Sequence, residues 1–407
     1  MKVLMKTVKP ETVGLASERL ARISRAMRVY VDSGRLPGAV AMVARRGQIA
    51  YAECFGWMDI AADKSMRLDT LFPIYSLTKP VISVAAMMLY EGGRFQLYDP
   101  VSEFIPEFKD MRVYVASTDA GMEVTDLKRE ITIHDLFTHT SGLSSGYDGE
   151  ENPLVDLYDK AVTRPDRPLC EVVQKLAGLP LRHQPGEAWR YGESYEVLAR
   201  LVELMSGMPV ADFLRQRIFE PLRMSETGYC IPDERLERLA KLYGFSDTGA
   251  VVEVAEPGLA YTPTLPRGGH GLISTASDYQ RFAQMLLNLG ELEGARLLGR
   301  KTVQWMTRNH LPEELMPIRT SFGFNGHGYG LGFRVLTDSV QFEVMGSEGE
   351  YGWYGWGGNY LWIDPAEDLI GLLMMRMEPF SSMRIDQMGC FSIINPFRVL
   401  VYQAIVD

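Results

Sequence analysis

The chain has 407 residues, of which 46% are hydrophobic and 23% charged, so a sizeable core needs no disulfide or metal to hold it together. Forty-two Lys and Arg against 52 Asp and Glu give a net charge of −10, which argues against a nucleic-acid-binding or anionic-membrane surface. The first ten residues hold no apolar stretch of signal-peptide length, and the longest apolar runs, near 81–90 and 369–375, are too short to span a bilayer. These features predict a cytoplasmic globular protein.

The cysteines support the same expectation. They are widely spaced and form no C-x-x-C motif, which is typical of reduced thiols and not of a disulfide framework: Cys54, Cys170, Cys230 and Cys390. The sequence also contains no Walker loop and no dinucleotide fingerprint, so we expect no nucleotide cofactor.

The first predicted elements are a helix and a hairpin. Ser17 is a plausible N-cap for a helix that Gly34 ends, with an apolar face at Leu20, Ile23, Met27 and Val31. Two short apolar runs, 39–44 and 49–55, lie on either side of a turn that contains Gly47, a pattern typical of a β-hairpin.

The middle of the chain is predicted to be mostly helical. A helix is expected from Ser76 through Leu89, and a short one over 133–140, with Thr132 as its N-cap and Gly142 as its stop. A further helix over 194–205 places its apolar side chains on one face.

The last third changes character. The runs 360–363 and 369–377 predict a second hairpin, and a final helix is expected over 397–405, with Asn395 as N-cap and Pro396 at the first helical position. Strands at both ends with helices between them favour an α+β fold, in which one sheet is built from both chain ends.

Ser76-Leu77-Thr78-Lys79 is the only S-x-x-K in the chain. At this helical spacing the two polar side chains lie on one face, so the amine can reach the hydroxyl. A serine hydroxyl becomes a good nucleophile when a neighbouring base takes its proton, and a lysine can be that base when desolvation or a nearby cation lowers its pKa. Ser76 would open the helix, where backbone N–H groups face a reacting carbonyl, and the apolar run after Lys79 would bury the amine. The alternative is a surface Ser and Lys that happen to lie three apart.

A second motif lies downstream. The turn-rich loop 185–192 places Tyr191 immediately before the helix predicted over 194–205. Together with Ser76-x-x-Lys79, its flanking Phe72, Pro73 and Tyr75, and the segment 136–143, this pattern resembles the serine β-lactamase/penicillin-binding-protein superfamily, in which S-x-x-K carries the nucleophile. The resemblance covers nearly the whole chain, from the first hairpin to Asn359, and includes the segment 268–276.

The resemblance implies an architecture and several roles. The expected fold is β-lactamase/transpeptidase-like, with an antiparallel sheet domain from 1–95 and 270–407, a mostly helical domain over 96–269, and the active site between them. Tyr191 is expected to relay the proton between Ser76, Lys79 and the leaving alkoxide. The backbone N–H groups of Ser76 and Asn359 would form the oxyanion hole, and Tyr75 would line the substrate pocket.

A third motif decides the subgroup. β-Lactamases of this superfamily carry Lys-Thr-Gly or a close relative on the strand that lines the site, whereas the matching strand here reads Trp356-Gly357-Gly358-Asn359. This is similar to the β-lactamase-like (family VIII) carboxylesterases. Trp356 offers an apolar wall and one N–H donor in place of a cation, and the two glycines allow close approach of the acyl group. The alternative is an ordinary Gly-kinked strand with a core tryptophan.

The sequence also departs from the family pattern. The second motif is often Tyr-x-Asn, but here it reads Tyr191-Gly192-Glu193, and a glutamate facing the site would add negative charge.

The resemblance implies a serine carboxylesterase that hydrolyses small to medium acyl esters through a Ser76 acyl-enzyme, with no cofactor and no metal. The expected partner is a small-molecule ester, with no nucleic acid and no membrane, and the oligomeric state is left open. The alternatives are an acyltransferase of the same superfamily, a weak β-lactamase or D-amino-acid peptidase, and a catalytically dead binding protein.

Other motifs compete for the catalytic roles. Gly142-Leu143-Ser144-Ser145-Gly146 fits the G-x-S-x-G nucleophile elbow, and His327 lies downstream, but a helix and not a strand is predicted before Ser144. His134 and His139 are five residues apart, off the spacing of a helical metal pair, and are expected to be structural. The aromatic cluster 351–356 is expected to form a pocket wall, with core packing as the alternative.

Overall fold

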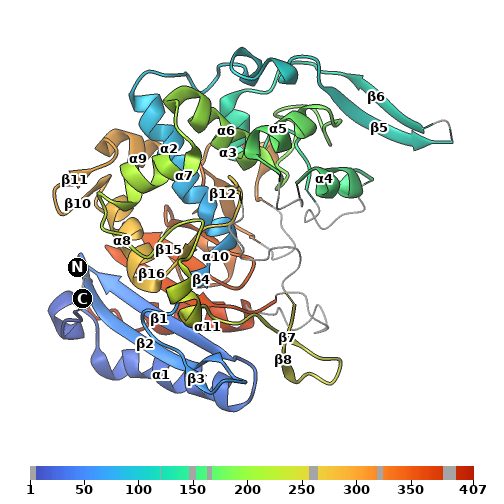
Figure 1. Ribbon diagram of the computed structural model, residues 1–407. Coiled ribbons are helices and arrows are strands. Elements are labelled where there is room, and N and C mark those ends of the chain that lie inside the picture. Colours follow the sequence, from blue (N-terminus) through green and yellow to red (C-terminus); the bar gives the residue numbers. More distant parts are fainter. Residues whose placement is uncertain are drawn as a thin grey trace.

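The computed structural model describes residues 6–119, 121–145, 153–162, 167–255, 265–318, 324–378 and 391–407. Its centre is an eight-stranded sheet in which segments from both ends of the chain pair side by side, all antiparallel (Figure 1). Across the sheet the strands are β12 (His327–Tyr329), β13 (Arg334–Leu336), β14 (Tyr351–Tyr354), β15 (Tyr360–Asp364), β16 (Leu369–Met375), β1 (Gly38–Arg45), β2 (Gln48–Asp59) and β3 (Lys64–Ser65).

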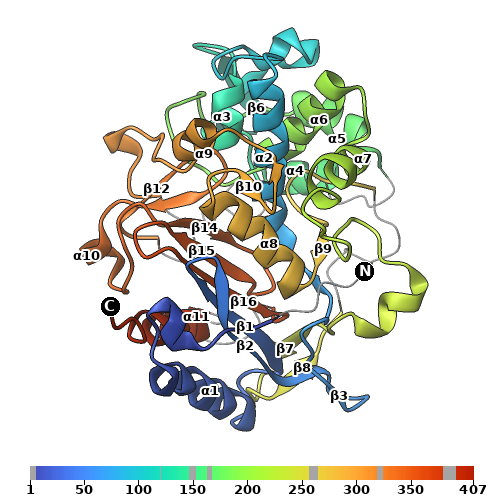
Figure 2. The ribbon, with the colours of Figure 1, turned by 90° about the vertical axis from the view of Figure 1, so that its left-hand side faces the viewer.

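The two central strands join the ends of the chain. β1 pairs with β16 from Ala39 opposite Met375 to Arg45 opposite Leu369, and every residue of both strands is buried. Continuous apolar runs suit this position because helices cover both faces of the sheet. On one face α1 (Ser17–Asp32) packs with α11 (Phe391–Tyr402), and α8 (Ala276–Leu287) lies on the other face (Figure 2).

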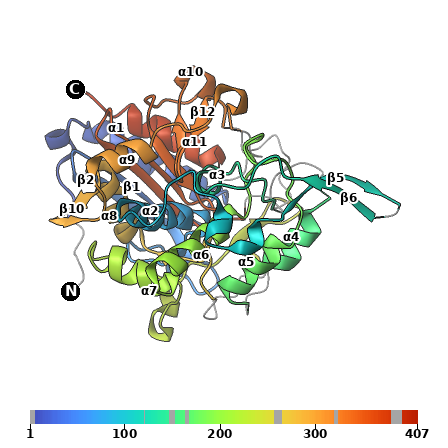
Figure 3. The same ribbon diagram turned by 90° about the horizontal axis from the view of Figure 1, so that it is seen from above.

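A mostly helical region lies beside the sheet, as the view from above shows (Figure 3). α2 (Thr78–Glu91) connects the two regions, because the 3-10 turn before it (Tyr75–Leu77) lies near β14 and α2 itself packs against α6. The other helices of this region are α3 (Ile133–Thr138), α4 (Val155–Val162), α5 (Leu169–Ala177), α6 (Ser194–Ser206) and α7 (Val210–Leu214).

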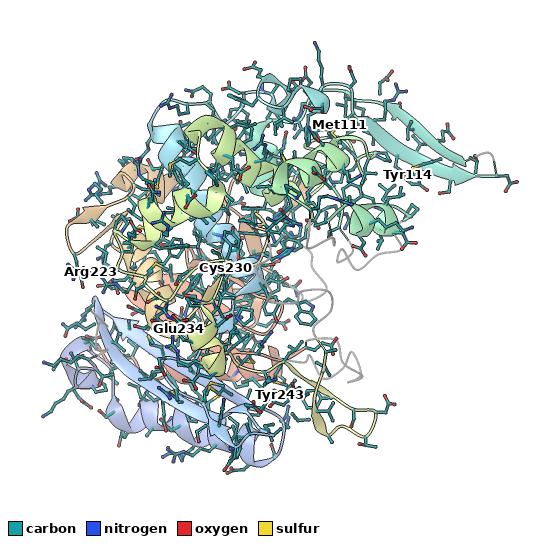
Figure 4. The ribbon with its side chains drawn as sticks, viewed as in Figure 1. Met111, Tyr114, Arg223, Cys230, Glu234 and Tyr243 are labelled. Carbon is teal, nitrogen blue, oxygen red and sulfur yellow. The ribbon has the colours of Figure 1, made fainter. Side chains whose placement is uncertain are left out.

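Four short two-stranded pairings and two further helices complete the described strands and α-helices. The ribbon of β5 (Arg112–Thr118) and β6 (Gly121–Asp126) projects from the helical region, and Tyr114 marks it in Figure 4. The rest are β4 (Phe72–Pro73) with β9 (Ile273–Ser274), β7 (Tyr243–Phe245) with β8 (Val251–Glu253), β10 (Glu291–Leu292) with β11 (Ala295–Arg296), α9 (Arg300–Met306) and α10 (Ser339–Phe342).

The structure confirms the α+β class, both hairpins and the main helices, and corrects two helix ends. The last helix does not begin at Asn395, because α11 already runs from Phe391 and contains Pro396. A proline has no N–H to donate four residues back, and here the Tyr30 hydroxyl donates to the Ser392 carbonyl instead, at 3.2 Å. α3 ends at Thr138 and not near Gly142, because His139 adopts a left-handed conformation with φ 57°.

Three expectations about special groups can be compared with the described residues. Cys54, Cys170 and Cys230 are free thiols there, while Cys390 lies outside the described residues. In the same part of the chain no helix is long and apolar enough to cross a membrane, and no three His, Cys, Asp or Glu side chains gather in a way that could hold a metal ion. The domain boundaries near residues 95 and 270 stay a prediction.

A fully buried charge cluster fastens α11 to the sheet. Arg398 of α11 donates to the Glu350 carboxylate at 2.8 Å, and Arg334 of β13 lies 3.6 Å from the other Glu350 oxygen; all three side chains are buried. The Tyr402 hydroxyl lies 2.8 Å from both Glu350 and Asp364. Because the charges are removed from water, losing Arg398 leaves the buried Glu350 carboxylate with its direct cationic hydrogen bond unreplaced.

We therefore expect Arg398→Met to lower the free energy of unfolding by about 3–5 kcal/mol. Arg28→Met is the matched control, because the Arg28–Glu53 pair has the same 2.8 Å separation but the Arg28 side chain is 65% exposed. It should lose less than about 1 kcal/mol. Urea unfolding of the two variants measures the difference, and equal losses would contradict the importance of burial.

Candidate active site

Ser76 lies in a tight turn at the start of α2. The turn is the 3-10 helix η2 (Tyr75–Leu77), so the predicted helix begins with one 3-10 turn before the α-helix proper starts at Thr78. Tyr75 has φ 47°, a left-handed conformation that is unfavourable for a bulky side chain. The Tyr279 hydroxyl donates to the Leu77 carbonyl at 2.7 Å and helps to hold this turn.

The structure brings the three predicted catalytic side chains together. The Tyr191 hydroxyl donates to Ser76 Oγ at 2.7 Å, and Lys79 Nζ donates to the same oxygen at 3.2 Å. Lys79 Nζ also donates to the Gly269 carbonyl at 2.9 Å and lies 4.6 Å from the centre of the Tyr191 ring. Ser76 is half-buried and Lys79 is only 5% exposed. One hydroxyl therefore has two hydrogen-bond partners that can each carry a proton.

His139 supports the tyrosine. Its ring lies 4.7 Å from the Tyr191 ring, and its Nδ1 accepts the Gly192 N–H at 3.3 Å. Burial, and secondly the charge of Lys79, hold the pKa of His139 well below its usual range, so the ring stays neutral and can accept this hydrogen bond. The Ser145 hydroxyl donates to the Tyr191 carbonyl at 2.9 Å. The histidine expected to be structural thus holds a catalytic candidate in place.

Trp356, Gly357 and Gly358 form a turn and not the strand that the sequence predicts. They connect β14 to β15, with the Gly358 N–H donating to the Gly355 carbonyl at 2.9 Å and the Gly355 N–H to the Asn359 carbonyl at 2.8 Å. This is a three-residue hairpin turn, which needs a left-handed residue at its last position, and Gly358 has φ 89°.

The same turn closes over the residue before the nucleophile. A Cβ at Gly357 would lie 2.6 Å from the Tyr75 ring, so only glycine fits there. The half-buried Trp356 ring lies 5.5 Å from the Tyr75 ring. The structure therefore brings the four predicted pocket residues together: Tyr75, Trp356, Gly357 and Gly358.

Asn359 is fully buried behind this turn. Its side-chain amide donates to the Pro73 carbonyl at 2.8 Å and accepts the Met375 N–H at 3.3 Å, so it ties the segment before Ser76 to the sheet. In the antiparallel register, the backbone N–H of Asn359 points toward Gly355, inside the hairpin. The Tyr354 amide points the opposite way, toward the edge that β13 covers only as far as Gly352.

Glu193 is the departure from the family pattern. It precedes the first residue of α6 and is half-buried. Burial and the charge of Glu196 raise the pKa of Glu193 to about 8, against the opposite effect of Lys79. At neutral pH the carboxyl is therefore mostly protonated and adds little negative charge to the site.

The competing motifs do not form a catalytic group in the described residues. Ser144 is 1% exposed and lies in an irregular segment after α3, with its carbonyl accepting the Glu193 N–H. His327 is held between Arg334 and the Asn325 carbonyl, and burial and Arg334 lower its pKa to about 2. His134 hydrogen-bonds His310 at 3.3 Å.

Sequence reasoning missed two groups next to the site. Arg376, which follows β16 and is 4% exposed, donates to the Ala240 carbonyl and lies 3.5 Å from the Tyr75 hydroxyl. Glu196 is fully buried beside the Gly268–Gly269 backbone. Neither belongs to a motif, and only the fold places them here.

A small cavity elsewhere does not compete with this site. It has a volume of about 40 Å³ and is lined by residues that include Leu71, Thr227, Cys230 and Ile273 (Cys230 is labelled in Figure 4). This is room for about one or two water molecules.

Comparison with known proteins agrees with the geometry. The β-lactamase family model matches residues 23–387. Protein Rv1367c of Mycobacterium tuberculosis is 34% identical over 363 residues, covering 87% of this chain and 89% of the relative. Esterase EstB of Burkholderia gladioli is 30% identical over 390 residues, covering 88% and 91%. The solved structure of EstCE1, described as a hydrolase with promiscuous acyltransferase activity, has a TM-score of 0.78 and 25% identity over 95% of this chain and 99% of that chain.

An antiparallel sheet flanked by helices, with a serine, a lysine and a tyrosine meeting beside it, defines a serine hydrolase with a β-lactamase/transpeptidase-like fold. The chain belongs to the β-lactamase family.

We expect Tyr191→Phe and Lys79→Ala each to lower kcat for a chromogenic ester by a factor of about 10² to 10⁴, because each removes a proton carrier from Ser76 Oγ. The double variant should lose far less than the product of the two factors, since both side chains serve one proton transfer.

Tyr195→Phe is the control, because Tyr195 is buried nearby but donates to the Phe137 carbonyl and does not touch Ser76. It should retain most of the activity. Steady-state kinetics of the wild-type protein and the four variants tests this, and strictly multiplicative losses in the double variant would argue against a shared role.

Proposed function

We propose that this protein is a serine carboxylesterase that hydrolyses small to medium acyl esters through an acyl-enzyme on Ser76. The observation that carries the proposal is the hydroxyl of Ser76, which receives hydrogen bonds from both Tyr191 and Lys79 at 2.7 and 3.2 Å. A relative that is 30% identical over most of the chain is named an esterase, which supports this substrate class.

In the first step Ser76 Oγ attacks the ester carbonyl while its proton passes to the neutral Lys79 amine, directly or through Tyr191. The tetrahedral intermediate then collapses, and the same two side chains return the proton to the leaving alkoxide, so that an alcohol departs. In the second step water attacks the acyl-enzyme and loses its proton to this pair. The pair then returns the proton to Ser76 Oγ as the acyl–oxygen bond breaks, which releases the acid and restores the serine hydroxyl.

The oxyanion of the intermediate needs preorganised N–H donors, each worth on the order of 3–4 kcal/mol. The Ser76 N–H is one proposed donor. Asn359 was expected to supply the second, but its N–H points into the hairpin, so we propose the Tyr354 N–H as the alternative donor from the same strand pair.

The wall of the pocket favours neutral substrates. Tyr75 and the half-buried Trp356 offer uncharged ring surfaces beside the turn that carries Ser76. Arg376 lies behind them, and its guanidinium already donates to the Ala240 carbonyl and lies near the Tyr75 hydroxyl. Arg267 is also buried, at 4% exposed, and lies within 3.5 Å of the Leu265 and Pro266 carbonyls.

Acyl transfer is the second candidate. EstCE1 is described as having promiscuous acyltransferase activity, and the acyl-enzyme is the same whether water or an alcohol receives the acyl group. Adding an acceptor alcohol to a test ester and measuring the ratio of new ester to free acid separates the two activities.

We expect Ser76→Ala to abolish hydrolysis of a butyrate ester, and Ser144→Ala to keep a large part of it. Ser144 is 1% exposed, so its hydroxyl is out of reach of an ester that enters from solvent. Labelling by a fluorophosphonate, located by peptide mass spectrometry, should fall on Ser76. An inactive but folded Ser144→Ala variant beside an active Ser76→Ala variant would overturn the assignment.

We also expect kcat/KM for a butyrate ester to exceed that for a chromogenic cephalosporin by about two or more orders of magnitude. The ring carboxylate of the cephalosporin loses its water in the pocket, and an indole cannot compensate its charge, which costs at least a few kcal/mol in the transition state. Both substrates are measured on one preparation. Comparable values would mean that Trp356 does not set the substrate class.

A further inference from the structure

We propose that Glu196 is a positioning residue for the reaction, acting on Lys79 through the backbone of Gly268 and Gly269. This proposal deepens the proposed function, because it concerns how the base of the same site is held.

The carboxylate of Glu196 binds two consecutive backbone N–H groups. One oxygen accepts from Gly268 at 2.9 Å and the other from Gly269 at 2.8 Å. The carbonyl of Gly269 in turn accepts from Lys79 Nζ at 2.9 Å, and Lys79 Nζ donates to Ser76 Oγ at 3.2 Å. A continuous chain of hydrogen bonds thus runs from Glu196 to the nucleophile, through a backbone segment that belongs to neither helix.

Both glycines are needed for this close contact. A Cβ at Gly268 would lie 1.8 Å from the Tyr195 carbonyl oxygen, so the segment is pressed against α6. A Cβ at Gly269 would lie 3.1 Å from a Glu196 oxygen and 3.3 Å from Lys79 Nζ. The second contact is tight but involves only the ends of two side chains, so Gly269→Ala should disturb the link without unfolding the protein.

Burial strengthens the hydrogen bonds between Glu196 and the Gly268 and Gly269 amides. Glu196 is 0% exposed, so its carboxylate has lost its water and is stabilised instead by these two backbone donors.

Other ionisable groups surround Glu196, and their effect on a pH profile must be distinguished from the effect of Glu196. Glu193, His270 and Tyr229 all interact electrostatically with Glu196, and Arg267 interacts with each of these three. Burial lowers the pKa of His270 to about 4 and raises that of Tyr229 far above its usual value, so neither titrates near neutral pH. Glu193, with a pKa of about 8, does titrate there.

The test is Glu196→Gln, which keeps the size of the side chain but leaves one oxygen for two N–H donors. We expect kcat for a butyrate ester to fall about tenfold or more with KM within about twofold, since substrate binding is not touched. Glu203→Gln is the matched control. It is the same change seven residues later on α6, where the carboxylate accepts the Val210 N–H and pairs with Arg200 away from the site. It should change kcat less than twofold.

The dependence of kcat/KM on pH distinguishes a specific effect on Lys79 from a general loss of structure. Glu196→Gln removes one negative charge from the buried surroundings of the site, so the acid limb of kcat/KM should move to lower pH. The profiles are measured in a Glu193→Gln background, so that Glu193 does not contribute. Gly269→Ala should lower kcat and leave the limb in place, because it alters geometry and not charge.

Unchanged kcat in a folded Glu196→Gln variant, or a loss with an unmoved limb, would overturn the proposal. If that variant does not fold, full activity in Gly269→Ala would overturn it instead. The rate of Ser76 labelling by a fluorophosphonate is recorded in every variant. This rate needs no ester turnover, so it reports on the Glu196 link even if the wild-type protein proves not to be an esterase.

Discussion

The shared hydrogen bonding of the Ser76 hydroxyl is the constraint on which the site depends. Its two partners come from different places: Lys79 from the same helix, and Tyr191 from a loop more than a hundred residues later that meets it at 2.7 Å. Each partner must be held to within a few tenths of an ångström for proton transfer to work. The neighbouring loops and the β14–β15 hairpin hold these side chains in position.

Tyr191 is held by its contact with the His139 ring, and Lys79 is held by a backbone carbonyl. His139 stays neutral because burial and the Lys79 charge lower its pKa, and in that form its Nδ1 can accept the N–H that follows Tyr191. Lys79 is fixed by a carbonyl of the Gly268–Gly269 segment. The two supports come from different segments of the chain.

The sheet supplies the third side of the site. The left-handed Tyr75 presses its ring against Gly357, and Asn359 ties the segment before the nucleophile to the β14–β15 hairpin. The turn between these strands therefore both shapes the pocket wall and keeps a strained residue in place. Glu193 is tolerated near this site because burial keeps its carboxyl largely protonated at neutral pH.

The sequence by itself determined the elements and the catalytic candidates. Periodicity of apolar residues, turn signals and a single S-x-x-K motif are local features, so they predict the α+β class, both hairpins and the nucleophile with its lysine. The resemblance to a known family added Tyr191, because a lone tyrosine in a loop carries no local signal of its own.

Only the tertiary structure decided how distant segments meet. Pro396 lies inside a helix because Tyr30, from the other end of the chain, supplies the missing donor, and no local pattern can show that. Trp356, Gly357 and Gly358 form a turn because the register of β14 and β15 puts Gly355 opposite Asn359. Glu196 and Arg376 reach the site only because the fold brings their backbones beside it, since hydrogen bonds between remote residues leave no spacing in the sequence.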